Sequence, residues 1–420
     1  MRVLHINTSD WGDETAVAAN RLTDALKNNG IKAKMLVRHK KTEQITVARL
    51  PQSPLSGIRT LCGNLSAWKT NRLRKSTGCR LDTADTGTDI TSLPEFKEAD
   101  IIHLHDTTDG LLSLKNIRSI IDSGKPVVWT LHDVWPFTGI CHHNGTCTAY
   151  RTACSRCPML NGRGKEHDLS TAVFRRKQQM LRGAHILFVA STGWLEKAAR
   201  QSAMLTGQEI VCIPNTICTH TFHPEGQKAA RLAFNLPADK KLLLFRTSPT
   251  GVRQAEYDTM AETCRILKET MGEEAEGIGI VVTGKDAELS GTALSFPVYT
   301  VEDIKDDKQL AKLYNAADAV VATSCEGGQS GLLMEAMACG VPCVGFDTGD
   351  FAEIITHKQN GFLAKPHHPE ELAEGIRFVL DTDMHGQLSS QAVHKVLSDF
   401  GETHIASRYI ALYHRITNKR

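Results

Sequence analysis

Short apolar runs alternate with longer amphipathic stretches along most of the chain. Continuous runs of Val, Ile and Leu are typical of strands that are buried on both faces of a parallel sheet. We expect such strands at Val3–Asn7, Ala33–Val37, Ile101–Leu104, Val127–Thr130, Ile186–Ala190, Glu209–Ile213, Lys241–Phe245, Gly277–Val282, Val298–Thr300, Ala319–Thr323 and Pro342–Phe346. Apolar residues at helical spacing predict helices between them, at Glu14–Asn29, Leu112–Ile121, Leu169–Gly183, Ala255–Met271, Gln309–Asn315 and Leu332–Ala338.

This alternation predicts an α/β protein with parallel sheets and right-handed crossovers. The chain has 420 residues, which fits two domains better than one. We expect a Rossmann-like N-terminal domain at 1–206, a second domain at 207–395, and a helical segment at 396–420 that packs back on the first. Ligands of doubly wound sheets bind beyond the carboxyl ends of the strands, so a cleft between the two sheets is the expected site.

Composition and charge narrow the class of protein. The net charge is +2, which argues against general nucleic-acid binding. An apolar run long enough to span a membrane is missing from the sequence, and Met1 leads directly into a strand-like segment rather than a signal peptide. We therefore expect a cytoplasmic protein, whose 12 cysteines are not paired in disulfides.

A basic amphipathic segment at 55–80 departs from the alternation. It carries six basic residues and no acidic one, and apolar residues recur in it at helical spacing. Such a helix binds anionic lipid headgroups or a lipid-phosphate acceptor in some proteins, which predicts peripheral contact with the inner face of the membrane. The alternative is a helix that packs on its own domain and exposes a basic edge.

A glycine-rich turn near residue 330 has the strongest chemical signal. Glu326-Gly327-Gly328-Gln329-Ser330-Gly331 connects a predicted strand to a predicted helix that carries Glu335. Free backbone N–H groups at a helix start attract a diphosphate, and a carboxylate nearby can accept hydrogen bonds from ribose hydroxyls. The alternative is an ordinary turn between a strand and a helix, with a surface glutamate.

The segment Glu335-Ala336-Met337-Ala338-Cys339-Gly340-Val341-Pro342 resembles the donor-site helix of family 4 retaining glycosyltransferases, which have the GT-B fold. Further segments resemble the family in the same order along the chain: Met1–Asn7, Trp129–Gly139, Ile213–Ile217, and Thr348–Asp350 followed by Glu353. The strongest resemblance is to bacterial exopolysaccharide transferases of the colanic-acid kind. It implies transfer of a hexose from a nucleotide sugar to a lipid-linked oligosaccharide, without a catalytic metal.

The resemblance also implies roles for individual residues. Glu335 would hold the ribose, His132 would lie near the donor sugar, and Arg253 would reach the diphosphate. We count His132, Glu326 and Arg253 as catalytic candidates. The candidates for binding the nucleotide sugar are Glu335, Gly12, Gly327, Gly328, Ser330, Gly331, Lys285 and Asn215.

Three departures from the family pattern motivate an alternative function. Glu326 and Glu335 are separated by eight residues, where the family has seven. Gln254 follows Arg253 where the family often has lysine, which removes a positive charge from the diphosphate site. Two acids, Asp13 and Glu14, follow Gly12 in the first loop. The alternative is a glycosyltransferase-like partner protein that binds without efficient catalysis; a GT-B phosphorylase or epimerase would need a different phosphate site.

Four cysteines cluster between residues 141 and 157, with the spacing Cys141-x5-Cys147-x6-Cys154-x2-Cys157. Two pairs of thiols at this spacing suit a tetrahedral structural zinc site. An iron–sulfur cluster, a redox pair at Cys154 and Cys157, and four unligated thiols are the alternatives. His142 and His143 are reserve ligands, and such a metal would brace one wall of the cleft rather than take part in the reaction.

Overall fold

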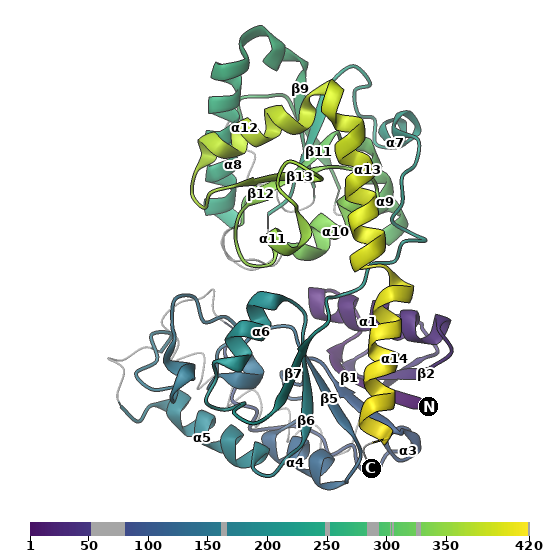
Figure 1. Cartoon of the computed structure of the whole chain (residues 1–420), viewed down its shortest axis with the longest axis vertical. Coiled ribbons are helices and arrows are strands. Elements are labelled where there is room, and N and C mark those ends of the chain that lie inside the picture. The colour runs from purple at the N-terminus through teal and green to yellow at the C-terminus, as the bar shows by residue number, and fades with distance from the viewer. Residues whose placement is uncertain are drawn as a thin grey trace. The chain divides into compact units, whose positions relative to one another are not determined.

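The computed structural model describes residues 1–51, 80–160, 166–247, 253–283, 294–302, 304, 306–324 and 329–418. The chain divides into two compact units (Figure 1). The first contains Met1–Thr216 together with Ile405–Arg420, and the second contains Ile217–His404. These bounds lie about ten residues beyond the boundaries at 206 and 395 that the sequence suggested.

The first unit is built on a seven-stranded sheet in the order β3-β2-β1-β4-β5-β6-β7. Every neighbouring pair in it is parallel. Its strands are β1 (Arg2–Ser9), β2 (Lys32–His39), β3 (Val47–Arg49), β4 (Ile101–Leu104), β5 (Val127–Leu131), β6 (Ile186–Ala190) and β7 (Glu209–Cys212). The strand order reverses between β1 and β4, which is where doubly wound sheets bind ligands.

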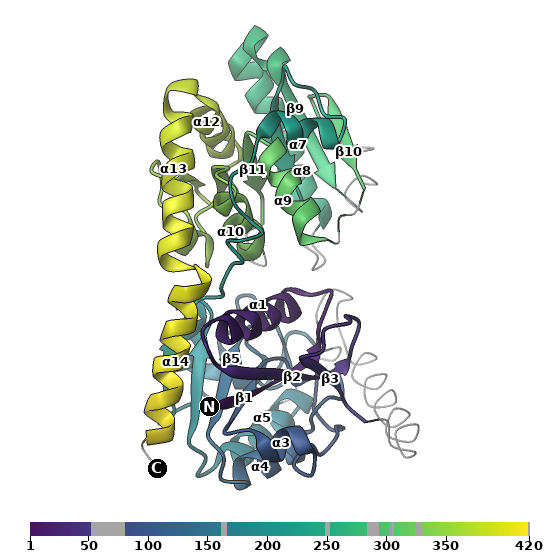
Figure 2. The same ribbon diagram turned by 90° about the vertical axis from the view of Figure 1, so that its right-hand side faces the viewer.

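Helices cover both faces of the first sheet. On one face, Leu22 and Leu26 of α1 (Glu14–Asn28) pack into the same apolar cluster as Tyr409 and Tyr413 of α14 (Glu402–Asn418). Figure 2 shows α14 running alongside this sheet. Among the described residues, the other face packs against α3 (Pro94–Glu98), α4 (Leu114–Asp122), α5 (Leu169–Leu181) and α6 (Gly193–Arg200).

The second unit has a six-stranded parallel sheet in the order β10-β9-β8-β11-β12-β13. Its strands are β8 (Lys241–Phe245), β9 (Ile278–Thr283), β10 (Val298–Val301), β11 (Ala319–Ala322), β12 (Cys343–Phe346) and β13 (Gly361–Ala364). One face packs on α7 (Gln227–Ala233), α9 (Asp307–Ala316), α10 (Ser330–Ala338), α11 (Phe351–Ile354) and α13 (Thr382–Asp399). The other packs on α8 (Arg253–Met271) and α12 (Pro369–Leu380).

The predicted fold class, two doubly wound parallel sheets, is confirmed. Two short strands, β3 and β13, were not predicted from the sequence. Both are edge strands of three or four residues, too short to give a clear apolar run. β7, which the expected boundary at residue 206 places in the second domain, pairs with β6 of the first sheet instead.

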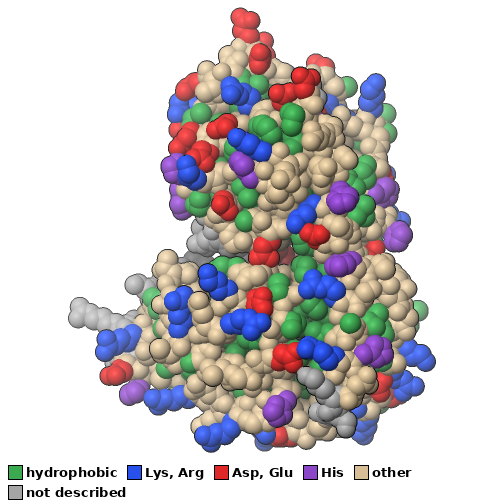
Figure 3. All heavy atoms as spheres, viewed as in Figure 1, with side chains coloured by type: hydrophobic (Ala, Val, Ile, Leu, Met, Phe, Trp, Pro, Cys, Tyr) green, Lys and Arg blue, Asp and Glu red, His purple; other side chains and the backbone are tan. Residues whose placement is uncertain are grey.

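The surface in Figure 3 carries basic and acidic side chains on both units, in keeping with the small net charge. Within the described part of the chain, the helices are too short or too polar to cross a membrane. The predicted basic helix at 55–80 lies outside the described residues, apart from Arg80.

Candidate functional site

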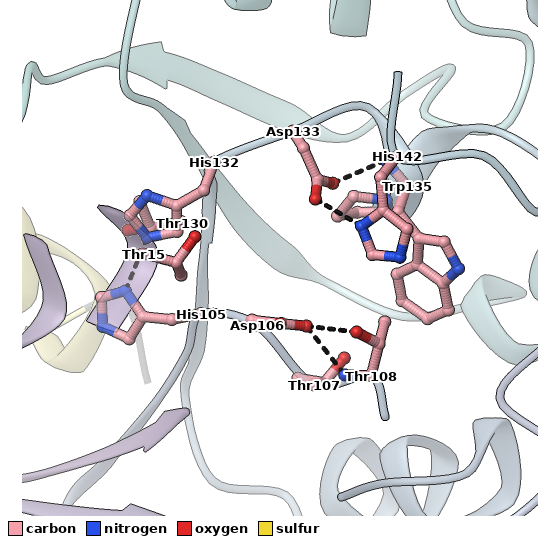
Figure 4. Close-up of a pocket in the computed structure, with 11 residues that line it drawn as sticks. Thr15, His105, Asp106, Thr107, Thr108, Thr130, His132, Asp133, Trp135 and His142 are labelled. Carbon is pink, nitrogen blue, oxygen red and sulfur yellow. Dashed lines mark hydrogen bonds and ion pairs between the residues drawn. The ribbon is translucent and has the colours of Figure 1, made fainter. Parts of the chain in front are cut away.

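A polar pocket lies at the switch point of the first sheet, beyond the carboxyl ends of β4 and β5 (Figure 4). The parallel strands place their carboxyl ends at one edge, so the segments that follow them meet there. The pocket is lined by threonine hydroxyls, imidazoles and carboxylates, together with the apolar surfaces of Trp135 and Pro136. The lining residues are Thr15, His105, Asp106, Thr107, Thr108, Thr130, His132, Asp133, Trp135, Pro136 and His142.

Three buried histidines lie behind this pocket on one face of the sheet. His5 of β1 is directly opposite His103 of β4 in the parallel register, and His105 is two residues further along the same strand direction. Alternate residues of a strand share a face, so the three imidazoles stack, with ring centroids 4.4–5.2 Å apart. His103 is held by Tyr413 of α14 at 2.6 Å and by Thr130 at 2.7 Å.

His132, predicted from the sequence as a cleft residue, lies in this pocket just after β5. Its Nε2 is 3.0 Å from Nδ1 of His105, and Nε2 of His105 is 2.9 Å from Nδ1 of His5. Burial lowers the pKa of His132 to about 4, although Asp133 and Asp106 oppose the shift. Burial lowers the pKa of His5 to about 3. Both imidazoles are therefore neutral near pH 7.

An Asp–His pair forms the opposite wall of the pocket (Figure 4). Oδ2 of Asp133 is 2.6 Å from Nδ1 of His142, and Oδ1 accepts the backbone N–H of Trp135 at 2.8 Å. Burial by itself raises the pKa of Asp133, but His142, the Trp135 N–H and Arg80 together lower it to about 2. An ionised Asp133 accepts a hydrogen bond from Nδ1 of His142, and the other ring nitrogen of His142 is Nε2. That atom is buried and has no hydrogen-bond partner among the described residues.

The third wall comes from the turn after β4. The Oδ1 atom of Asp106 accepts from both the backbone N–H and the hydroxyl of Thr108. Arg80 donates to Asp106 at 3.0 Å and to Thr108 at 2.7 Å. The hydroxyl of Thr107 is buried without a partner among the described residues. The pocket thus presents several oriented donors and acceptors, an arrangement that suits a ligand rich in hydroxyl groups.

One of the two acidic residues of the first loop, Asp13, has a structural role. Gly12 has a φ of +98°, a conformation that L side chains rarely adopt. Asp13 is the N-cap of α1 and accepts the backbone N–H of Ala16 at 2.7 Å. The carboxylate of Asp13 is therefore engaged in capping the helix. Trp11, beside these residues, is exposed.

The four cysteines of the predicted metal site lie in the loop after β5 and in the turn before α5. The backbone N–H of Gly139 donates to Sγ of Cys154 at 3.2 Å. Burial, with Cys141 and Cys147 nearby, raises the pKa of the Cys154 thiol to about 12, and that of Cys157 is raised to about 12 in the same way. Cys154 and Cys157 therefore each lie within electrostatic range of Cys141 and Cys147.

In the described ranges, the histidines His5, His103 and His105 are the group whose possible ligand atoms lie within 4.8 Å of one another. No three of the four cysteine sulfurs, all of which are among the described residues, form such a group. The histidine rings stack at interplanar angles of 23–35°, and both nitrogens of His103 have partners. Lone pairs in the planes of stacked rings do not converge on one ion, so the arrangement favours a hydrogen-bonded stack over a metal site.

In the second unit, Glu335 lies on the second turn of α10, after the switch point between β8 and β11. Its Oε2 accepts the phenol of Tyr314 at 2.8 Å. Burial, followed by Glu335, raises the pKa of Tyr314, and the charge of Arg246 opposes that shift. Arg246 follows β8 directly, and its carbonyl accepts the side-chain amide of Gln329 at 2.8 Å. Glu335 is therefore buried with a phenol donor, and the guanidinium of Arg246 lies near that phenol.

The start of α10 is tied to the turn after β12. The hydroxyl of Ser330 donates to Oδ2 of Asp350. Burial, together with Glu353, raises the pKa of Asp350 to about 6. Gly331 has open space where a Cβ atom would lie. Ser330 and Gly331, which we expected in the turn before the helix, are instead the first two residues of α10, and Glu335 follows them on the same helix.

The remaining predicted residues are placed only in part. Glu326, Gly327, Gly328 and Lys285 lie outside the described residues. Arg253 is the first residue of α8. Asn215 is half-buried in the segment after β7, in the first unit.

Sequence analysis missed several residues of these sites: His5, His103, His105, Arg246 and Tyr314. A signal was present for the histidines, because His103-Leu104-His105 places two polar residues inside an otherwise apolar strand. In the sequence, Tyr314 cannot be told from an ordinary aromatic core residue of a helix. Its contact with Glu335 depends on how α9 packs beside α10.

Comparison with known proteins gives a partial match in sequence and a full match in fold. Residues 247–382 match the family described as Glycosyl transferases group 1. D-inositol 3-phosphate glycosyltransferase 2 of Catenulispora acidiphila is 30% identical over 197 residues, which cover 43% of this chain and 42% of that protein. The chain spans only 28–47% of the length of the first curated relatives it matches.

Solved structures match the whole chain. Anabaena HepE in complex with UDP-glucose has a TM-score of 0.63 and 14% identity, with 99% of this chain and 100% of that chain covered. WaaG, a glycosyltransferase involved in lipopolysaccharide biosynthesis, has a TM-score of 0.60 and 14% identity, with 97% of this chain and 98% of that chain covered. The chain therefore shares the fold of these proteins, the GT-B fold.

Proposed function

Because residues 247–382 carry the glycosyl transferases group 1 match, we propose that this protein is a retaining glycosyltransferase that moves a hexose from a nucleotide sugar to a saccharide acceptor. The observation that carries the proposal is that this matched segment contains Glu335, buried on α10 at the switch point of the second sheet. HepE, which shares the fold, was solved with UDP-glucose. A UDP-sugar is therefore the first donor class to test.

The donor site is assigned to the second unit. Glu335 accepts the ribose hydroxyls, and the phenol of Tyr314 holds its carboxylate in place. The first turn of α10, with Ser330 and Gly331, offers backbone N–H groups to the diphosphate. Arg246, at the carboxyl end of β8, adds a positive charge near Tyr314, the hydrogen-bond partner of Glu335. Arg253 and Lys285 are further candidates for the diphosphate.

In the proposed reaction, the bond between the anomeric carbon and the diphosphate oxygen breaks while the acceptor oxygen bonds to the same face of that carbon. The proton of the acceptor hydroxyl passes to the leaving phosphate. Positive groups and helix N–H donors stabilise the charge that develops on the diphosphate, which is the main source of rate acceleration in this scheme. No metal ion is required for this step. Glu326, which precedes the turn, is a candidate for contact with the sugar.

The polar pocket of the first unit is proposed to bind sugar hydroxyls. His132 and the Asp133–His142 pair offer imidazole nitrogens on two walls, and Thr107 offers a hydroxyl on the third. Directional groups of this kind discriminate hydroxyl patterns, because a mismatched ligand leaves a buried donor or acceptor unpaired. Gly12, after β1, and Asn215, after β7, are further candidates for close approach to substrate.

The four-cysteine loop is proposed to hold a structural zinc ion. The thiols of Cys141, Cys147, Cys154 and Cys157 would supply the four ligands. Two features of the loop fit thiolates. The Gly139 N–H donates to Cys154. The buried Nζ of Lys177, whose pKa burial lowers to about 7, donates to the carbonyls of Trp135 and Thr138 and lies near enough to Cys141 for the two groups to interact. Such a metal would fix the loop that carries His142.

The acceptor is proposed to be a lipid-linked saccharide of surface-polysaccharide assembly. WaaG, with the same fold, is involved in lipopolysaccharide biosynthesis. The segment 55–80, with its six basic residues, suits contact with anionic lipid headgroups. A second candidate function is a glycosyltransferase-like binding partner with impaired catalysis. The uncharged Gln254 beside Arg253 and the shifted Glu326 favour it.

Release of nucleoside diphosphate from a panel of nucleotide sugars tests the proposal. Wild type should hydrolyse one donor slowly, and Glu335→Ala should lose that release. Glu374→Ala, an exposed glutamate on α12, is the matched control and should retain it. Folded protein that neither releases nor binds any nucleoside diphosphate would contradict the donor site. Binding without release, even when lipid-linked acceptors are added, would favour the non-catalytic partner.

A further inference from the structure

The histidines His5, His105 and His132 form a continuous hydrogen-bonded chain from the core of the first sheet into the pocket. We propose that His105, held by His5, is a positioning residue that keeps His132 in the tautomer with its proton on Nδ1. The effect on transfer rests on the function proposed above, but the tautomer itself does not.

The chain can have only two polarities. The two contacts are 2.9 Å between Nδ1 of His5 and Nε2 of His105, and 3.0 Å between Nδ1 of His105 and Nε2 of His132. Each neutral imidazole carries one N–H and one lone pair, so each contact needs a proton from one side only. If His5 donates, then His105 must donate to His132. If His132 donates, every bond in the chain runs the other way.

The far end of the chain selects between these polarities. Nε2 of His5 is buried and has no hydrogen-bond partner in the described part of the protein. When His5 donates through Nδ1, this Nε2 is an unpaired lone pair. When the chain runs the other way, it is an unpaired N–H. Buried N–H groups without a partner are rarer and more costly than under-satisfied acceptors, so His5 is the donor.

The consequence lies at the pocket. His105 donates from Nδ1 to Nε2 of His132, so the proton of His132 is on Nδ1. Figure 4 shows the other ring nitrogen of His132 on the edge that faces away from His105. His132 is then a hydrogen-bond donor to a substrate oxygen, with its ring held in one orientation. Burial, which keeps His5 and His132 neutral, maintains one proton on each ring.

His103 provides a matched control because it is in the same stack but outside the chain. Its ring lies 4.4 Å from that of His105, yet its nitrogens bond to Tyr413 and Thr130. Replacement of His103 therefore disturbs the same buried layer without removing a donor to His132. An effect that the His105 and His103 variants share comes from disturbed packing of this buried layer. An effect confined to the His105 variants comes from loss of the hydrogen bonds that link His5, His105 and His132.

The tautomer can be read directly from ¹⁵N chemical shifts in protein labelled at histidine, with the His132 signals assigned from a His132→Asn variant. Wild type should show a protonated Nδ1 and an unprotonated Nε2 at His132. In His105→Leu the tautomers should become mixed, while His103→Leu should keep the wild-type pattern. A protonated Nε2 at His132 in wild type would overturn the proposal without any variant, as would an unchanged pattern in folded His105→Leu.

The second readout uses turnover of a UDP-sugar. His105→Leu should lower kcat on the order of tenfold or more, because the donor to substrate is no longer fixed. His105→Asn can still donate from the position of Nδ1 and should restore part of kcat. Equal losses in the Leu and Asn variants would contradict a positioning role. If no nucleotide sugar is turned over at all, the proposed function fails, whereas the chemical shifts still decide the tautomer.

Discussion

The phenol of Tyr314 donates a hydrogen bond of 2.8 Å to the carboxylate of Glu335. Both side chains are buried, and they come from neighbouring helices, α9 and α10. Tyr314→Phe removes the donor but keeps the ring. We expect the free energy of unfolding to fall by about 1–2 kcal/mol, because a buried carboxylate loses a partner. Affinity for the nucleoside diphosphate should also fall. Urea unfolding and calorimetric titration measure the two effects.

The control for this prediction is Tyr299→Phe. Tyr299 lies half-buried on β10 of the same unit, and no hydrogen bond of its hydroxyl is found among the described residues. This variant should change neither quantity. If Tyr314→Phe unfolds at the same urea concentration as wild type, the hydrogen bond to Glu335 contributes nothing to stability.

The cysteine loop predicts a metal content. Protein purified without chelators should carry about one zinc ion per chain, since four thiolates complete a tetrahedral site. Cys157→Ser should lose most of the zinc and lower the melting temperature. Cys264→Ser, at a buried cysteine of α8 in the second unit, should keep the zinc although its buried hydroxyl lowers the melting temperature, so it separates loss of metal from loss of core packing. Elemental analysis that finds iron, or no metal in folded wild type, would exclude the zinc assignment.

The half-buried carboxyl of Asp350 predicts a pH dependence of stability. Its pKa is raised from 3.8 to about 6, so the folded protein binds this proton more tightly than the unfolded chain does. The free energy of unfolding should therefore fall as the pH rises from about 4 to about 6, and the loss should be complete above that range. Asp350→Asn should remove this part of the pH dependence. The exposed Asp347→Asn should leave it in place, as chemical unfolding at several pH values would show.

Substitution by alanine should have opposite effects on stability at two helical glycines. A Cβ atom on Gly375 of α12 would come within 2.5 Å of the Phe362 ring and 2.9 Å of Val344. A Cβ atom on the exposed Gly386 of α13 would meet nothing within 4 Å. Gly375→Ala should destabilise the protein by about 1–3 kcal/mol through overpacking. Gly386→Ala should stabilise it by about 0.5–1 kcal/mol, because alanine has the higher helix propensity. If thermal unfolding shows that the two substitutions change stability in the same direction, the packing argument is contradicted.

The donor-site helix α10 shows how much of the site can be predicted from local sequence. The glycine-rich turn through Gly331, the apolar spacing after it and the stop at Gly340 predict a helix at Leu332–Ala338 that carries Glu335. The observed helix α10 begins two residues earlier, at Ser330, and ends at Ala338, with Gly340 in a positive-φ conformation. These signals lie within a few residues of one another along the chain. Tyr314 could not be assigned to this site, because its phenol meets Glu335 only through the packing of two helices.

The sequence by itself determined the class of fold, because hydrophobic periodicity is a local property and each buried strand or amphipathic helix carries its own pattern. It also located the cysteine loop, the α10 segment and His132. The tertiary structure alone decided which distant residues meet. His5, His105 and His132 become neighbours because β1, β4 and β5 are adjacent in the sheet and in a particular register. Strand order and register depend on the packing of the whole unit, which a local pattern does not encode.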